Sequence, residues 1–177
     1  MNHIGIMLRW CSLIICLAAA GLWDIKARRI PNPWIYFWYF FGFGVYACSG
    51  WLAVLGYLVR SAAAVSLLFL LFLFRMMGAG DVKCMALICG YLGIPDGLWV
   101  IASGMGIGAL WSLWKLLHGL AGERIGYLYA YFRQVFQEKR IIAYYIPERD
   151  GRKVTLPLVF CLFLGLICVF LLRYQSI

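Results

Sequence analysis

Charged side chains are scarce in this chain of 177 residues, at 13% of the sequence. Soluble proteins carry roughly 25%, so the shortage excludes an ordinary soluble globular domain. Hydrophobic residues make up 65% of the chain and aromatic residues 18%, and aromatic side chains are typical of the lipid–water interfaces of membrane proteins. We therefore expect an integral membrane protein surrounded by the lipid bilayer.

Histidine is rare, with only His3 near the start of the chain and His118 near the end of an apolar segment. We expect both at the surface, so hydrolysis by a Ser/His or Cys/His pair is not favoured. The seven cysteines all lie in apolar stretches and none forms a Cys-x-x-Cys pair, so the spacing of metal ligands is absent. We expect small buried side chains there, and neither a metal nor another cofactor.

Acidic residues are outnumbered by Lys and Arg, 7 to 16, which gives a net charge of +9. A basic chain can bind nucleic acid, but this one carries no recognisable base-reading motif, and we expect no nucleic-acid partner. Membrane proteins concentrate Lys and Arg in their cytoplasmic loops, and that tendency accounts for the excess.

Six apolar segments follow one another along the chain. They cover residues 4–23, 33–49, 53–74, 81–94, 97–118 and 156–173. A spanning helix needs about 20 residues, so the pattern predicts an all-α polytopic membrane protein of about six transmembrane helices, forming a single domain over residues 1–177. The fourth segment is short and fits a partial or tilted span, and only a weak turn signal at Ser49-Gly50 separates the second from the third.

The connections between segments alternate in charge. Those after segments one, three and five carry Lys and Arg, whereas those after segments two and four carry none. This alternation predicts that the odd-numbered connections face the cytoplasm and that both termini lie outside. Arg9 and Arg60 lie inside apolar segments, and we expect their side chains to extend toward the outer interface.

The connection over residues 119–155 is the one sizeable polar stretch. We expect it to hold an amphipathic helix on the cytoplasmic membrane surface, because apolar residues recur there at helical spacing. These residues are Ile125, Leu128, Phe132, Val135 and Phe136.

Two aspartates stand at the ends of apolar segments. Asp24 ends the first segment and Asp81 begins the fourth, and the two crossings between them, by segments two and three, place both at the cytoplasmic face. Acids beside membrane spans are costly and suggest function, and two close carboxylates can share one proton, as aspartic proteases require. A structural role stays open for each: Asp81 as a helix N-cap, and Asp24 as the partner of a basic residue in Lys26–Arg29.

Five residues are candidates for supporting this acid pair. Gly78 and Gly80 let the backbone bend before Asp81 and approach a substrate closely. Pro31 and Asn32 belong to a turn that opens the second segment, with Asn32 as the expected N-cap and the proline after it as the first helical residue. Lys83 extends to the cytoplasm or tunes the acids electrostatically. Elsewhere, Gly104 and Gly108 are expected to mediate close helix packing.

Together these residues resemble a known family. Asp24, Arg29-Ile30-Pro31-Asn32 and Gly78-Ala79-Gly80-Asp81-Val82-Lys83 are similar to the motifs of the type IV prepilin peptidase family, which are Gly-x-Gly-Asp membrane aspartic peptidases. Thr155-Leu156-Pro157, with Gly165 beyond it, looks like the motif that opens the family's last helix. The resemblance runs from about residue 20 to residue 173.

The resemblance implies that Asp24 and Asp81 are the catalytic pair. Such enzymes sit in the bacterial cytoplasmic (inner) membrane and cut the basic leader peptide from prepilin or pseudopilin precursors at the cytoplasmic membrane face. Longer members carry a further cytosolic domain with paired Cys-x-x-Cys motifs and also methylate the new N-terminus. This chain shows no match to that domain and resembles the short form of tight-adherence (Flp-type) pilus systems.

Two other classes of function remain open on the residues alone. A small transporter or channel could use the same acids to move protons or a cation. A non-catalytic subunit of a secretion machine would need neither carboxylate for chemistry.

Overall fold

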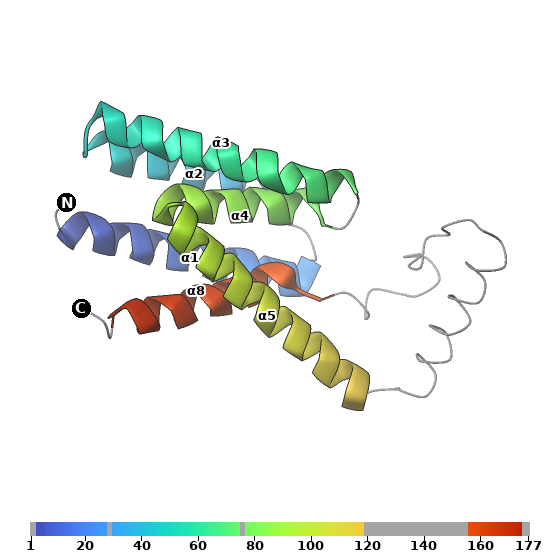
Figure 1. Ribbon diagram of the computed structural model, residues 1–177. Helices are drawn as coiled ribbons and strands as arrows, with labels where there is room; N and C mark the ends of the chain where they lie inside the picture. The colour runs from blue at the N-terminus through green and yellow to red at the C-terminus, as the bar shows by residue number, and fades with distance from the viewer. Residues whose placement is uncertain (1–2, 28–29, 75–76, 119–155, 175–177) are drawn as a thin grey trace. The chain divides into compact units, whose positions relative to one another are not determined.

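The computed structural model describes residues 3–27, 30–74, 77–118 and 156–174, and every element in these ranges is a helix (Figure 1). The helices are α1 (His3–Ala27), α2 (Asn32–Ala47), α3 (Trp51–Leu73), α4 (Ala79–Leu92), α5 (Ile94–His118) and α8 (Leu158–Tyr174). The all-α prediction is therefore confirmed for the described residues, and the six helices match the six apolar segments. The amphipathic helix expected within 119–155 falls outside them.

Three helices are long and apolar enough to cross a membrane, over Gly5–Ala27, Trp51–Leu73 and Ile94–Lys115, and Leu158–Arg173 is a shorter apolar helix. This is a membrane protein by length and composition of its helices. With 16 residues in α2 and 14 in α4, these two helices are shorter than the roughly 20 residues of a full span. Six transmembrane helices thus remain a prediction.

The chain divides into two compact units, residues 1–107 with 157–177, and residues 108–156. The first unit holds α1 to α4, the first part of α5, and α8. The structure describes only the last part of α5 in the second unit. That the whole chain forms one domain remains a prediction.

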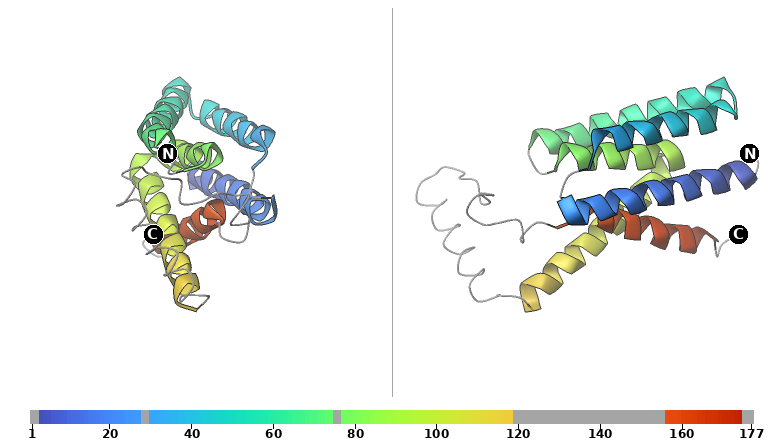
Figure 2. Two further views of the ribbon diagram at one scale, coloured as in Figure 1. Left: turned by 90° about the vertical axis from the view of Figure 1, so that its right-hand side faces the viewer. Right: turned by 180° about the vertical axis from the view of Figure 1, so that it is seen from behind.

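Helix α4 is the core of the first unit. Every residue from Cys84 to Tyr91 is buried, and a helix that is apolar and covered all round is typical of a protein interior. It lies along α3 and contacts α1 and α2 as well (Figures 1 and 2). Helix α4 is therefore surrounded by protein over most of its length.

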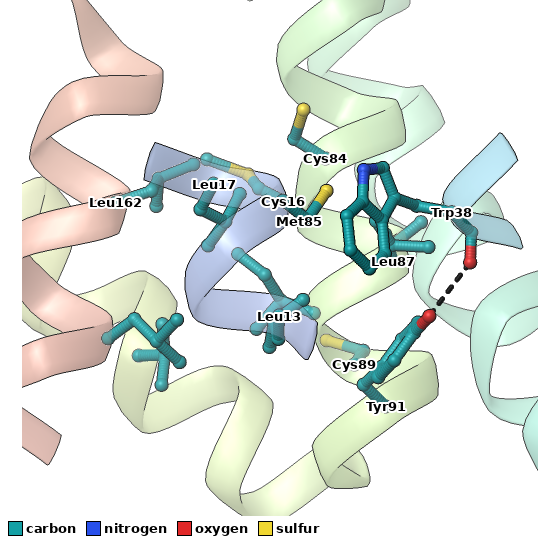
Figure 3. Packing of buried hydrophobic residues seen from close by; sticks show 14 of the residues in the cluster. Leu13, Cys16, Leu17, Trp38, Cys84, Met85, Leu87, Cys89, Tyr91 and Leu162 are labelled. Carbon is teal, nitrogen blue, oxygen red and sulfur yellow. Dashed lines mark hydrogen bonds between the residues drawn. The ribbon is translucent and has the colours of Figure 1, made fainter. Parts of the chain in front are cut away.

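Helix α1 joins this core to α8. In Figure 3, Leu13 and Leu17 of α1 lie between Leu162 of α8 and the side chains of α4. On the other side of α4, the hydroxyl of Tyr91 donates to the carbonyl of Trp38 in α2 at 2.8 Å. Buried tyrosine hydroxyls need such partners in an apolar interior, so this hydrogen bond stabilises the packing of α2 on α4.

Glycine is required at two turns. Gly50, between α2 and α3, has φ +106°, and Gly93, between α4 and α5, has φ +91°. This conformation is open to glycine and strained for other residues. The weak turn signal at Ser49-Gly50 was therefore a true helix boundary.

Glycine also allows α5 and α8 to approach each other closely. A Cβ added at Gly165 would lie 2.5 Å from the backbone nitrogen of Gly104, and one added at Gly104 would lie 2.8 Å from the Cα of Leu162. Contacts this short are possible only without side chains. The predicted packing role of Gly104 is confirmed, with α8 as its partner, and that of Gly108 remains a prediction.

Changing Gly165 to Ala should destabilise the protein by about 1–3 kcal/mol, because the new methyl group meets backbone atoms that cannot move aside. Gly106→Ala is a matched control on α5, since nothing lies within 4 Å of a Cβ there. That control should be neutral or stabilising by up to about 1 kcal/mol. Unfolding in detergent measures both, and equal effects would contradict the close approach of α5 and α8.

Candidate active site

Asp24 lies in the last turn of α1 and is held by the start of α8. Its Oδ2 accepts a hydrogen bond from the backbone N–H of Val159 at 3.0 Å. The first N–H groups of a helix have no partner within the helix, and that end carries a partial positive charge. The N-terminus of α8 therefore favours a negatively charged carboxylate at Asp24.

The position of Val159 follows from the residue before α8. Pro157 precedes the helix, and its carbonyl accepts the N–H of Cys161 at 3.3 Å. Proline is well suited to the start of a helix because it lacks an N–H that would otherwise be unpaired. Of the basic partners expected for Asp24, Arg28 and Arg29 lie outside the described residues.

Asp81 lies in the first turn of α4, and the prediction that it is the N-cap was wrong. Gly78 takes the cap position in an extended conformation, and Asp81 is the third helical residue. Its Oδ2 accepts a hydrogen bond from the backbone N–H of Gly78 at 3.3 Å. This is one of the two hydrogen bonds of a capping box; the other needs a side chain on the cap residue, which glycine lacks. The helix begins earlier than predicted because Gly78 needs no side chain to start it.

The two candidate glycines differ in their contacts. A Cβ at Gly78 would lie 3.1 Å from Oδ2 of Asp81, whereas the nearest atom to a Cβ at Gly80 is Cδ1 of Ile30 at 3.9 Å. Gly78 therefore leaves room for the carboxylate of Asp81. No steric need for glycine is evident at position 80.

Asp24 and Asp81 lie close enough to interact electrostatically. Burial raises the pKa of Asp81, the charge of Asp24 raises it further, and the hydrogen bond from Gly78 partly opposes both. Helix α1, which carries Asp24, packs against α4, which carries Asp81. One carboxylate held negative and a second biased toward its neutral form can together share a single proton.

Lys83 and Asn32 connect α4 to the turn that follows α1. The ammonium of Lys83 donates to Oδ1 of Asn32 at 3.0 Å and lies 5.6 Å from the centre of the Tyr36 ring. The prediction that Asn32 caps α2 was wrong, because Pro31 occupies the cap position without a side-chain hydrogen bond. The amide oxygen of Asn32 is instead used by the charged donor, which forms the stronger hydrogen bond.

Two contacts near the acids carry no signal that sequence reasoning could use. The indole Nε1 of Trp34 donates to the carbonyl of Cys16 at 3.3 Å and so joins α2 to α1. The ring of Trp34 also packs edge-to-face against that of Trp23, the neighbour of Asp24, with the two ring centres 5.0 Å apart. The other contact is the hydrogen bond from the backbone N–H of Val159 to Asp24. The one feature of the sequence that points to it is the proline before α8.

The described residues contain no group of three or more His, Cys, Asp or Glu side chains that could hold a metal ion. Their polar groups near the acids include the two carboxyls, the ammoniums of Lys26 and Lys83, and the backbone N–H groups of helix starts. Such a set can hold a water molecule, transfer its proton and polarise a carbonyl.

The family model of the type IV leader peptidase family matches residues 11–113 of the chain. This chain belongs to the type IV leader peptidase family. The matched region is more than half of the chain and includes both aspartates, the turn at Pro31-Asn32 and the start of α4. No curated protein and no solved structure matches the chain.

Changing Asp24 to Asn should lower the pKa of Asp81, because it removes the neighbouring negative charge and keeps the shape of the side chain. The pKa should stay above the ordinary range, because burial is the larger cause of the shift. Carbon-13 NMR of labelled aspartate carboxyls across a pH titration measures this. An unchanged pKa of Asp81 in the variant would show that the two carboxyls do not interact.

Proposed function

We propose that this protein is a membrane aspartic endopeptidase that cleaves the basic leader peptide from type IV prepilin-like or pseudopilin precursors. The proposed site of cleavage is the cytoplasmic face of the bacterial inner membrane. Membership of the leader peptidase family supports peptidase activity. The observation that carries the aspartic mechanism is the electrostatic contact between Asp24 and Asp81, two acids that come from distant parts of the chain.

The surroundings of the two acids support a different role for each. Asp24, which accepts the N–H of Val159, is the ionised partner and takes a proton from water. Asp81, whose pKa is raised, is the neutral partner and donates a hydrogen bond to the scissile carbonyl oxygen. The hydroxyl of the water adds to the carbonyl carbon, the C–N bond breaks, and the proton passes to the leaving amine.

The supporting residues hold the acids in place rather than react. Gly78 provides the N–H and the space beside Asp81. Lys83 holds Asn32 and so fixes the turn after Pro31, which follows directly on the helix that carries Asp24. Within the described residues, Lys83 forms no ion pair with either acid.

Recognition of the precursor should rest on its apolar helix. The leader peptide is basic and this chain carries a net charge of +9, so long-range attraction does not bring them together. We infer that the hydrophobic helix of the precursor docks against the bundle within the bilayer and extends its scissile bond to the acids. Deleting the hydrophobic segment of the precursor should abolish cleavage; cleavage at the original rate would contradict this mode of recognition.

Asp24→Asn and Asp81→Asn should each reduce leader cleavage by at least about a thousandfold, because either change removes one half of the proton-sharing pair. Asp96→Asn is the matched control: Asp96 pairs with Arg173 and takes no part in the proposed chemistry. A gel assay of a purified precursor in proteoliposomes measures cleavage, with insertion of each variant checked by extraction. Full activity of either acid variant would remove the aspartic mechanism.

The pH dependence of cleavage should follow the raised pKa of Asp81. The active form carries one proton on the pair, and a raised pKa keeps that proton in place to higher pH than an ordinary aspartate, whose pKa is about 3.9, would. Above the raised pKa, kcat/KM should fall about tenfold per pH unit. Measured profiles that stay level from mildly acidic into alkaline solution would contradict the role of Asp81 as the neutral partner.

A further inference from the structure

Two arginines from different helices share one aromatic ring. The Cζ of Arg9 in α1 lies 4.1 Å from the centre of the Tyr46 ring, and the Cζ of Arg60 in α3 lies 5.4 Å from the same centre. Tyr46 belongs to the last turns of α2 and is buried. Arg9 and Arg60 were expected to extend toward the outer interface, and the structure places both guanidiniums beside the ring of Tyr46.

This arginine pair lies away from the acids. Arg9 precedes Asp24 by fifteen residues on α1, which is about 22 Å of helix. Helices α2 and α4 both end at the end of the first unit where α1 begins (Figure 1); Tyr46 lies in the last turn of α2, and Gly93 directly follows α4. Nothing in the proposed cleavage reaction uses this region.

The charge of the pair is not neutralised by the described part of the chain. Neither guanidinium forms an ion pair or a hydrogen bond with another described residue. Two like charges beside one ring in an apolar bundle repel each other more strongly than they would in water. Stacking on an aromatic ring compensates only part of the cost of taking a cation out of water. An anion that contacts both arginines would offset the remainder.

Two glycines lie beside the guanidinium of Arg60. The Nε atom of each arginine is buried and has no hydrogen-bond partner. The terminal nitrogens of the two guanidiniums are not among the buried atoms that lack a partner. The two terminal nitrogens of Arg60 face glycines: a Cβ added at Gly56 would lie 3.9 Å from one, and a Cβ added at Gly93 would lie 3.8 Å from the other. The side chains that could crowd this guanidinium are therefore absent on both sides.

We propose that Arg9 and Arg60 together bind a phosphate group at the end of the bundle opposite the acids. The planar fork of a guanidinium matches the oxygens of a phosphate, with two donors to one group. Basic pockets between membrane helices are known to take the headgroups of anionic lipids. The phosphate comes from an anionic phospholipid or from free phosphate in solution, and the chemistry of binding is the same for both.

The test uses the full chain in neutral detergent, with phosphatidylglycerol, phosphatidylcholine and sodium phosphate as probes. Native mass spectrometry and a thermal shift measure binding. Wild-type protein should bind phosphatidylglycerol more tightly than phosphatidylcholine, and Arg9→Gln or Arg60→Gln should weaken this binding about tenfold. Lys115→Gln, which removes the same charge elsewhere on the chain, should not.

Sodium phosphate distinguishes the two sources. If it displaces phosphatidylglycerol, and binds in a way that depends on the same two arginines, the site takes free phosphate; if only the lipid binds, the site takes a headgroup. Equal binding of phosphatidylglycerol by wild type and both Gln variants would overturn the proposal. So would the absence of any preference for phosphatidylglycerol together with no binding of phosphate.

Lys variants keep the test decisive if a Gln variant does not fold. Arg9→Lys and Arg60→Lys retain the charge but present a single point donor group in place of the fork, so binding should weaken while the fold persists. Unchanged binding in both Lys variants and in their combination would contradict the forked contact. Binding is read without any cleavage, so its failure would leave the peptidase proposal untouched.

Discussion

The backbone N–H of Val159 donates to the carboxylate of Asp24, and the arrangement of the acid end depends on this one hydrogen bond. It connects the start of the last described helix, α8, to the end of the first, α1. Helix α1 in turn packs against α4, which presents Asp81 in its first turn. An acid at the C-terminal end of its own helix meets an unfavourable dipole, and the N-terminus of α8 compensates for it.

The two carboxyls are unequal because their surroundings are unequal. Asp24 faces the N-terminus of a neighbouring helix, whereas Asp81 is mainly desolvated and also feels the charge of Asp24. A basic residue placed between them would neutralise the pair and remove this inequality. Lys83 is close in sequence to Asp81, yet its ammonium is held by Asn32 and the ring of Tyr36. Within the described residues, Lys83 therefore does not form an ion pair with the two acids.

Much of the fold could be predicted from the sequence, because apolar runs and their interruptions are local features. The six segments, the boundary near Gly50 and the close packing at Gly104 all follow from residue type and spacing. The two crossings between Asp24 and Asp81 predicted that both lie at the same face, which permits them to meet but does not require it. The shortness of α4 was visible in the sequence, but its burial by protein on all sides could not be predicted, since burial depends on which helices are its neighbours.

The candidate site was less predictable than the fold. Asn32 and Asp81 are both good capping residues, but the N-cap residues in the structure are Pro31 for α2 and Gly78 for α4. The side chains of Asn32 and Asp81 make other contacts. The N–H of Val159 is a backbone group, which every residue type except proline provides, so no residue type reveals it. The convergence of Arg9 and Arg60 on Tyr46 depends on the register of three helices, which the sequence of each one alone does not contain.

Cross-linking of residues 24 and 81 in native membranes tests the central claim most directly. Cysteines would replace both aspartates, a short bifunctional thiol reagent would be added, and mass spectrometry would identify the joined peptides despite the native cysteines. A pair at positions 24 and 93 is the control, because Gly93 lies at the other end of α4. The account predicts efficient linkage of 24 to 81 and none of 24 to 93. The account would be contradicted if positions 24 and 81 were not linked and each cysteine were labelled from a different side of the membrane.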